Sequence, residues 1–265
     1  MITLCRTVLF LLAAAVLSAG VAGAQTTHYC SQYAPLAISD GYNVQNDFYD
    51  MTGGTLCTDV NTSTGAFTVD NTNSTATNGS PGGYPSIYVG CHFGTCSSYG
   101  GGMPIQQSLI GTATSSWSVM PASSGAWDIA YDIWFNQSST TSGQPNNQPN
   151  GTEIMIWLNH IGGVQPAGSS TGQTLTVNGI NFTPWVANQI SFCGCGTKWN
   201  VVSYVANTPV NSVSNLNLQT FFQDAIKRGQ LESNWYLIDV EAGTEVWQGD
   251  NGFKSNSFSV AVAHK

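Results

Sequence analysis

The chain of 265 residues contains 14 Asp and Glu, 6 Lys and Arg and 29 Gly, and only 8% of its residues are charged, where an ordinary soluble domain has about a quarter. A net charge of −8 argues against a nucleic-acid-binding protein, which needs a basic face, and the 11% aromatic content argues against a disordered chain. The composition therefore favours a strand-rich globular protein with a polar surface of Ser, Thr, Asn, Gln and Gly.

Residues 1–24 have the pattern of a secretory signal peptide. Arg6 is the single charge, an apolar run extends to Leu17, and residues 22–24 form an A-x-A cleavage site. The unbroken apolar run is shorter than the about 20 residues that span a bilayer, so the pattern disfavours a membrane anchor. We expect a secreted, extracellular chain with a single domain over residues 25–265.

The cysteines after residue 24 are even in number, which in a secreted chain predicts disulfides; they are Cys30, Cys57, Cys91, Cys96, Cys193 and Cys195. Local spacing predicts the pairs Cys91–Cys96 and Cys30–Cys57. The remaining C-G-C segment at 193–195 fits either a tight bridge or two free thiols. The four histidines show no zinc-ligand spacing, so we expect no metal and no cofactor.

Two segments alternate as half-buried strands. In 127–135, one side of the strand carries only apolar side chains, and the other side carries Asp128, Ala130, Asp132 and Trp134. In 153–159, one side is aliphatic and the other carries Glu153, Met155, Trp157 and Asn159. Their β-branched and aromatic content predicts further strands at 199–205, 235–240 and 257–262.

One helix is predicted at 218–228, where apolar residues recur at 218, 221, 222, 225 and 226. Asn217 fits its N-cap, Lys227 and Arg228 suit the C-terminal dipole, and Gly229 ends it. Many strands with one helix predict an all-β fold, a β-sandwich with a single packed α-helix.

Few carboxylates in the sequence lie in apolar or aromatic surroundings. Five aspartates fall in turn-rich segments and are expected to be solvated: Asp40, Asp50, Asp59, Asp70 and Asp250. Glu153 instead opens an apolar strand beside Met155 and Trp157, which fits either a sugar-binding cleft or an exposed strand end. Glu245 also has a Trp two residues on, and a pair of carboxyl groups is what a glycosidase needs.

Several segments together resemble glycoside hydrolase family 12, the endo-β-1,4-glucanases, over nearly all of residues 25–265. They occur in the family's order: V-Q-N at 44–46, G-Y-P-S-I-Y-V-G-C-H at 83–92, Y-D-I-W at 131–134, E-I-M-I-W at 153–157, V-Q-P at 164–166 with G-S at 168–169, the helix region 216–228, S-N-W-Y-L at 233–237, G-T-E-V-W-Q at 243–248 and S-F-S at 257–259.

The resemblance implies a β-jelly roll of two curved antiparallel sheets with an open cleft on the concave face. It implies retaining hydrolysis of β-1,4-glucan chains by a monomer, with Glu153 as nucleophile, Glu245 as general acid/base and Asp132 placed against the nucleophile. It also implies sugar contacts in the cleft from Tyr33, Asn46, Asp47, Tyr49, Trp134, Met155, Trp157 and Asn159. Tyr33 and Tyr49 stand where the family commonly has Trp, and a smaller ring offers less stacking area.

Three alternatives accompany this interpretation. A xyloglucan-specific endoglucanase of the same family would share the carboxyl groups but differ in substrate. A non-catalytic carbohydrate-binding jelly roll would use the same aromatic residues, but it would tolerate the loss of a carboxylate. A related xylanase would share the architecture, although the E-x-M-I-W and G-x-E-x-W motifs favour the glucanase.

Overall fold

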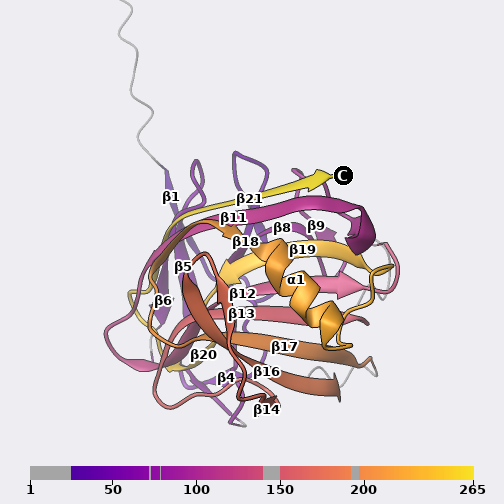
Figure 1. Ribbon diagram of the computed structural model, residues 1–265. Helices are drawn as coiled ribbons and strands as arrows, with labels where there is room; N and C mark the ends of the chain where they lie inside the picture. The colour runs from indigo at the N-terminus through magenta and orange to yellow at the C-terminus, as the bar shows by residue number, and fades with distance from the viewer. Residues whose placement is uncertain (1–24, 72, 78, 140–149, 192–196) are drawn as a thin grey trace, which may run out of the picture.

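The computed structural model describes residues 25–71, 73–77, 79–139, 150–191 and 197–265, and within these ranges two stacked β-sheets form most of the protein (Figure 1). The smaller sheet has the order β1 (Thr26–Tyr29), β5 (Leu56–Asn61), β6 (Phe67–Asn71), β21 (Lys254–His264), β11 (Ile110–Met120) and β18 (Ser212–Asn217).

The larger sheet carries the longest run of neighbouring strands. Its order is β14 (Ser169–Ser170), β16 (Ile180–Ile190), β17 (Trp199–Ala206), β13 (Thr152–Ile161), β12 (Gly125–Asn136), β19 (Tyr236–Gly243), β8 (Ser86–His92), β3 (Asn43–Gln45) and β2 (Leu36–Ala37). Short strands flank this path: β4 (Met51–Thr52), β7 (Thr75–Ala76), β9 (Thr95–Cys96), β10 (Ile105–Gln106), β15 (Leu175–Val177) and β20 (Val246–Gly249). A 3₁₀ turn, η1 (Gln107–Leu109), precedes β11.

The pairings between these strands are antiparallel except for β13 and β17, which run parallel. The predicted all-β sandwich is therefore confirmed, and the expectation of purely antiparallel sheets is corrected at this one pair. The parallel pair matters for the site, because it places Trp199 at the start of β17 beside the start of β13.

The main core lies between the sheets, and the predicted strand alternation produces it. Trp127, Ile129 and Tyr131 of β12 are buried there, together with Ile154 and Ile156 of β13. A second apolar cluster lies on the opposite face of the larger sheet and consists of Ala130, Trp134, Met155, Trp157, Ala187, Trp199, Val201 and Ile238. Both faces of β12 and β13 are thus largely apolar, which leaves the few carboxylates there in a low-dielectric setting.

The helix α1 (Leu218–Lys227) matches the predicted segment and packs beside β11 and β13 at the edge of the sandwich (Figure 1). The Asn217 side chain accepts a hydrogen bond from Thr220 N at 3.3 Å, as expected of an N-cap, and Gly229 has a φ of 70° just after the helix. Phe221 and Phe222 are fully buried. Burial of each such side chain contributes about 1.5–3 kcal/mol, so α1 is held mainly by this apolar face.

Both predicted disulfides are present. Cys30–Cys57 ties the segment after β1 to β5, and Cys91–Cys96 joins β8 to β9. Cys193, Cys195 and the predicted signal peptide lie outside the described residues. Among the residues described, no helix has both the length and the apolar character needed to cross a membrane.

One expectation for the aspartates is wrong. Asp250, expected to be solvated in a turn, is fully buried. The turn after β20 folds against β6, with Gly252 N donating to Val69 O and Val69 N donating to Phe253 O at 2.9 Å each. Because Phe253 is itself buried in the core, the turn is covered instead of exposed.

Candidate active site

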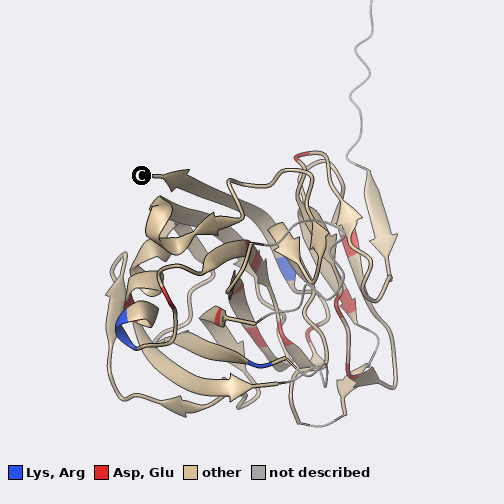
Figure 2. Ribbon diagram, turned by 90° about the vertical axis from the view of Figure 1, so that its right-hand side faces the viewer, with Lys and Arg blue, Asp and Glu red and all other residues tan. Residues whose placement is uncertain are grey.

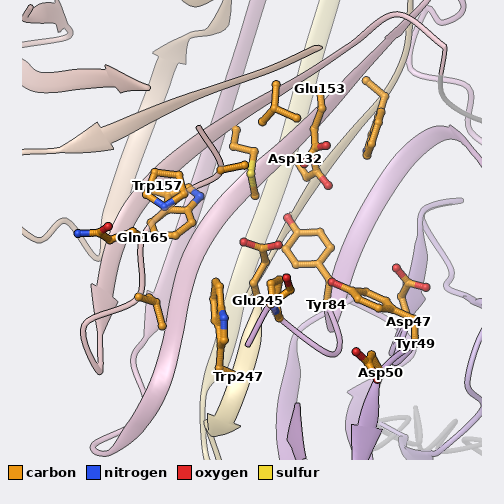
Figure 3. A pocket seen from close by; sticks show the side chains of 18 of the residues that line it. Asp47, Tyr49, Asp50, Tyr84, Asp132, Glu153, Trp157, Gln165, Glu245 and Trp247 are labelled. Atoms are coloured by element: carbon orange, nitrogen blue, oxygen red, sulfur yellow. The ribbon is translucent and has the colours of Figure 1, made fainter. Parts of the chain in front are cut away.

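A cleft of about 1100 Å³ lies on the face of the larger sheet that is turned away from the main core. Its floor consists of side chains from β12, β13 and β17, and loop residues 47–50, 79–84 and 162–167 contribute to its walls. Acidic residues outnumber basic ones across the protein, and several lie on the strands in Figure 2. The aromatic rings of the cleft and its carboxyl groups face one another in Figure 3.

Three carboxyl groups from separate segments meet in this cleft. Asp132 comes from β12, Glu153 from β13, and Glu245 from the connection between β19 and β20. Asp132 pairs with Met155, so Glu153, two residues earlier, is its diagonal neighbour on the same face. Figure 3 shows the Asp132 and Glu153 carboxyl groups side by side, with the Glu245 carboxyl group below them, next to the Tyr84 ring. The strand alternation and the chain crossover thus assemble the group that the sequence predicted.

One hydrogen bond favours the charged form of Glu153 and acts against the effect of burial. Its side chain is 7% exposed, and its Oε2 accepts a 2.6 Å hydrogen bond from Trp199 Nε1 on β17. Burial, together with the neighbouring Glu245, raises the pKa of Glu153 to about 8, and the Trp199 hydrogen bond limits this rise. The indole donor therefore favours the carboxylate that a nucleophile requires.

The pKa values of Asp132 and Glu245 are both raised. Burial raises the pKa of Asp132 well above its usual range, and repulsion from Glu153 adds to the effect. Burial also raises the pKa of Glu245, and the neighbouring Asp128 raises it further. Glu153 thus receives a hydrogen bond from an indole, and its neighbours Asp132 and Glu245 have raised pKa values. A glycosidase needs such a pair of roles, a carboxylate that attacks and a carboxyl group that protonates the leaving oxygen.

A second group of titratable residues borders the cleft. His92 Nδ1 forms an ion pair with Glu241 Oε1 and lies 3.7 Å from Asp239 Oδ2. Glu241 Oε2 accepts hydrogen bonds from Gln45 Nε2 at 3.1 Å and Ser86 Oγ at 3.0 Å. The pKa of His92 is raised well above its usual value, because the attraction of Glu241 and Asp239 outweighs burial. The imidazolium thus supplies positive charge next to two buried carboxyl groups.

This same group is the part of the cleft that has metal-ligand spacing. His92, Asp239 and Glu241 each place one ligand atom within 4.8 Å of the others. In the structure His92 Nδ1 is instead paired with Glu241 Oε1, and both oxygens of Glu241 have polar neighbours. An ion pair with protonated His92 accounts for these contacts.

Six of the eight predicted sugar-contact residues line the cleft: Tyr33, Asp47, Tyr49, Trp134, Met155 and Trp157. The rings of Tyr33 and Tyr49 are 57% and 46% exposed, so both present open faces to a sugar. Burial raises the pKa of Asp47 to about 6, with His92 acting in the opposite direction.

Asn46 and Asn159 do not line the cleft. Asn46 is fully buried, and its Nδ2 donates to the backbone oxygens of Tyr29 and Ser31 at 3.0 and 2.9 Å, so it secures the N-terminal segment. Asn159 donates to Asn211 Oδ1 at 3.1 Å. A one-residue register shift next to Ala130 pairs Asn159 with Ile129, a core residue, and this bulge interrupts the alternation on which the prediction relied.

Several site residues were not predicted from the sequence. Trp199 begins a strand whose pattern indicates only burial, and its role depends on the parallel pairing with β13. Trp247 lines the cleft beside Glu245, and its position two residues after that glutamate was a usable signal. Phe93 lines the cleft with its ring 4.6 Å from His92 and 6.3 Å from Trp134. It follows the recognised segment 83–92 directly and could have been included with it.

Comparison with known proteins identifies the chain's relatives. The family model described as glycosyl hydrolase family 12 matches residues 40–263. The probable cellulase Cel12b of Mycobacterium tuberculosis is 32% identical over 163 residues, which are 62% of this chain and 99% of that protein. A probable xyloglucan-specific endo-β-1,4-glucanase A of Aspergillus fumigatus is 38% identical over 140 residues, which are 51% of this chain and 52% of that protein. The match thus spans about half the length of this relative.

Solved structures give the same result for the fold. The endoglucanase cel12A from Rhodothermus marinus superimposes with a TM-score of 0.80 at 36% identity, covering 91% of this chain and 100% of that one. A metagenome-derived endoglucanase of family 12 also gives a TM-score of 0.80, at 34% identity, covering 91% and 99% of the two chains. The sandwich is therefore the jelly roll that the sequence implied, and the chain belongs to glycosyl hydrolase family 12.

Proposed function

We propose that the protein is a secreted, retaining endo-β-1,4-glucanase that acts on cellulose-type or mixed-linkage β-glucan. The observation that carries this proposal is the set of Asp132, Glu153 and Glu245 in a cleft with aromatic walls, with the Trp199 indole donating a hydrogen bond to Glu153. An open cleft lets a polysaccharide bind along its middle, which suits cleavage at internal bonds.

In the first step, Glu153 attacks the anomeric carbon and the bond to the leaving oxygen breaks. Glu245 gives its proton to that oxygen, and a glycosyl ester with Glu153 results. In the second step Glu245 takes a proton from water, the water oxygen bonds to the anomeric carbon, and Glu153 is released as a carboxylate. Two inversions give net retention.

Asp132 contributes as a neutral neighbour of the nucleophile. With its raised pKa it holds a proton, and a protonated carboxyl group beside Glu153 donates a hydrogen bond where an ionised one would repel. Met155 and Trp157 line the cleft on the same strand as Glu153 and give the sugar an apolar surface.

Substrate preference within the family is the second part of the proposal. Relatives named xyloglucan-specific endo-β-1,4-glucanase A are 38% identical over 140 residues, so xyloglucan is the alternative substrate. A relative from Phytophthora nicotianae is named an inactive glycoside hydrolase and is 37% identical over 139 residues, which makes a binding function worth testing. The presence of both glutamates in one cleft favours catalysis here.

The test compares purified residues 25–265 with the Glu153→Gln variant on barley β-glucan, carboxymethylcellulose, tamarind xyloglucan and xylan. We expect new reducing ends from a β-glucan in the wild type and a loss of several orders of magnitude in the variant. A folded wild type that binds glucan but releases no reducing ends would contradict the proposal and support the binding function. Fastest release from tamarind xyloglucan would correct the substrate.

A further inference from the structure

Asp128 is a buried carboxyl group that the proposed reaction does not yet use. It lies on β12 four residues before Asp132 and is fully buried. Its position in the sheet is opposite the junction of β19 and β20, where the chain carries Glu245: Trp127 pairs with Val246 on one side, and Ala130 pairs with Gly243 on the other.

Asp128 is bound to the Glu245 segment by three hydrogen bonds, two of them to the backbone of Glu245. Asp128 N donates to Glu245 O at 3.1 Å, and Glu245 N donates to Asp128 Oδ1 at 3.1 Å. Thr244 Oγ1 donates to Asp128 O at 2.6 Å. At the break between two strands, a side-chain oxygen thus takes the place of a backbone acceptor. The backbone that carries Glu245 is fixed to β12 through the same residue whose carboxyl group faces it.

The second oxygen of Asp128 lacks any such donor. Oδ2 is buried, and no N–H or O–H group of the described residues other than carboxyl groups reaches it. The Glu245 side chain lies within hydrogen-bonding range of the Asp128 carboxyl group. Two carboxyl groups can bond only if a proton lies between them, so the pair must hold at least one proton to satisfy this buried oxygen.

We propose that Asp128 is the positioning residue of Glu245, and that the reactive enzyme carries one proton on each of these two carboxyl groups. This inference rests on the proposed function of Glu245 as general acid. With a single proton, the pair forms a strong bond between a carboxyl and a carboxylate, and the proton lies between them instead of facing the substrate. With two protons, Asp128 donates to the inner oxygen of Glu245, and the outer oxygen carries the proton for the leaving group.

The step balances without any further reactant. The glycosidic C–O bond breaks, the bond from the anomeric carbon to Glu153 forms, and the proton on the outer oxygen of Glu245 moves to the leaving oxygen. Asp128 keeps its proton throughout and stabilises the carboxylate that forms on Glu245 with a hydrogen bond. The loss of the first proton from the pair therefore ends activity on the alkaline side.

Most titratable side chains that surround the Asp128–Glu245 pair are acidic. Asp132 on β12 and Asp250 after β20 raise the pKa of Asp128, together with burial. Glu153 on β13 faces Glu245 across the cleft. Tyr49 and Tyr84 lie near Glu245. His160 pairs with Asp128 across the strands, but its pKa is lowered by burial alone, so it supplies no charge to Asp128.

The first test is the pH profile of kcat/KM on β-glucan for the wild type, Asp128→Asn and Asp128→Ala. The Asn side chain keeps an oxygen for Glu245 N and offers an N–H to the inner oxygen of Glu245 at any pH. We expect its alkaline limb to move upward by about one pH unit, since coupled carboxyl pairs interact by more than this, while the acid limb stays in place. The Ala variant loses the backbone tie as well and should lose more activity.

Asp70→Asn is the control for removing one acidic side chain, because Asp70 lies on β6 of the other sheet. Neither limb of the pH profile of Asp70→Asn should move. If Asp128 had only a structural role, both limbs of the pH profile of Asp128→Asn would lie at their wild-type positions. An alkaline limb that is unchanged or moves downward in Asp128→Asn overturns the inference, even where hydrolysis of glucan holds.

The second test does not need activity. Carbon-13 labelling of Asp and Glu carboxyl groups allows the pair to be titrated by NMR. We expect the Glu245 signal to change in two steps in the wild type and in one step in Asp128→Asn. A single-step titration in the wild type overturns the pairing. Absence of glucan hydrolysis by the folded wild type would instead refute the proposed function, with the NMR titration still deciding the pairing.

Discussion

Removal of the Trp199 indole donor tests whether the charge of Glu153, the proposed nucleophile, depends on a hydrogen bond from that indole. Trp199 Nε1 donates to Glu153 Oε2 at 2.6 Å, and the ring is 3% exposed. In Trp199→Phe, the carboxylate of Glu153 loses a bond of a kind that contributes about 1.5–3 kcal/mol when one partner is charged. Because one pKa unit corresponds to about 1.4 kcal/mol, the pKa of Glu153 should rise by about one to two units.

The consequence is a shift of the acid limb of kcat/KM. Glu153 must be ionised to attack, so the acid limb should move to higher pH by the same one to two units. Below the limb, the rate at fixed pH should fall by about 10- to 100-fold. The assay is reducing-end release from barley β-glucan across the pH range. The alkaline limb belongs to the proton donor and should change little.

A matched variant separates this effect from loss of packing. Trp117 on β11 is also buried, with its Nε1 donating to Ser255 Oγ at 3.0 Å, but it lies in the other sheet. Trp117→Phe should lower stability and leave both limbs in place. A folded Trp199→Phe enzyme with an unchanged acid limb would refute the reasoning, since the indole would then have no influence on the charge of Glu153.

Three further predictions concern the site and the core. The buried carboxyl groups Asp132, Glu245 and Asp250 have raised pKa values, so the folded chain binds more protons than the unfolded chain above the unfolded pKa of about 4. Stability should therefore fall as pH rises above about 4, and calorimetry should find the higher unfolding temperature at the acid end; a rise with pH would contradict the directions of the shifts. Asp132→Asn should shift the acid limb and lower the rate, and an unchanged profile would remove Asp132 from the site. Phe222→Ala should cost about 3–5 kcal/mol in denaturant unfolding, while Gln223→Ala on the exposed side of α1 should change stability by under about 0.5 kcal/mol; equal effects would contradict the assignment of the buried face.

The fold was largely predictable because its signals are local. The alternation in β12 and β13 separates core from cleft residues through the side-chain period of two. The helix has its cap, its apolar stripe and its terminal glycine within one short segment. The spacing of Cys91 and Cys96 also identified their pairing.

The errors arise where the chain breaks a local rule or where distant segments meet. A bulge in β13 moves Asn159 off the predicted face, and a covered turn buries Asp250. The contact of Trp199 with Glu153 depends on a parallel pairing that no periodicity indicates. Asp128 shares its face with Asp132, but its relation to Glu245 depends on where β20 joins β12. Sequence patterns identify faces of strands, whereas these features depend on which strands become neighbours.

The central claim is that Glu153 forms a covalent bond with the sugar. An activated 2-deoxy-2-fluoro cellotrioside slows both steps of a retaining enzyme, so the intermediate should accumulate. Mass spectrometry of the protein and its peptides should find one added fluorosugar on the peptide that contains Glu153, and none in Glu153→Gln. An adduct on a different residue would contradict the assignment of the nucleophile. No adduct, with release of a product of inverted anomeric configuration from glucan, would contradict the retaining mechanism.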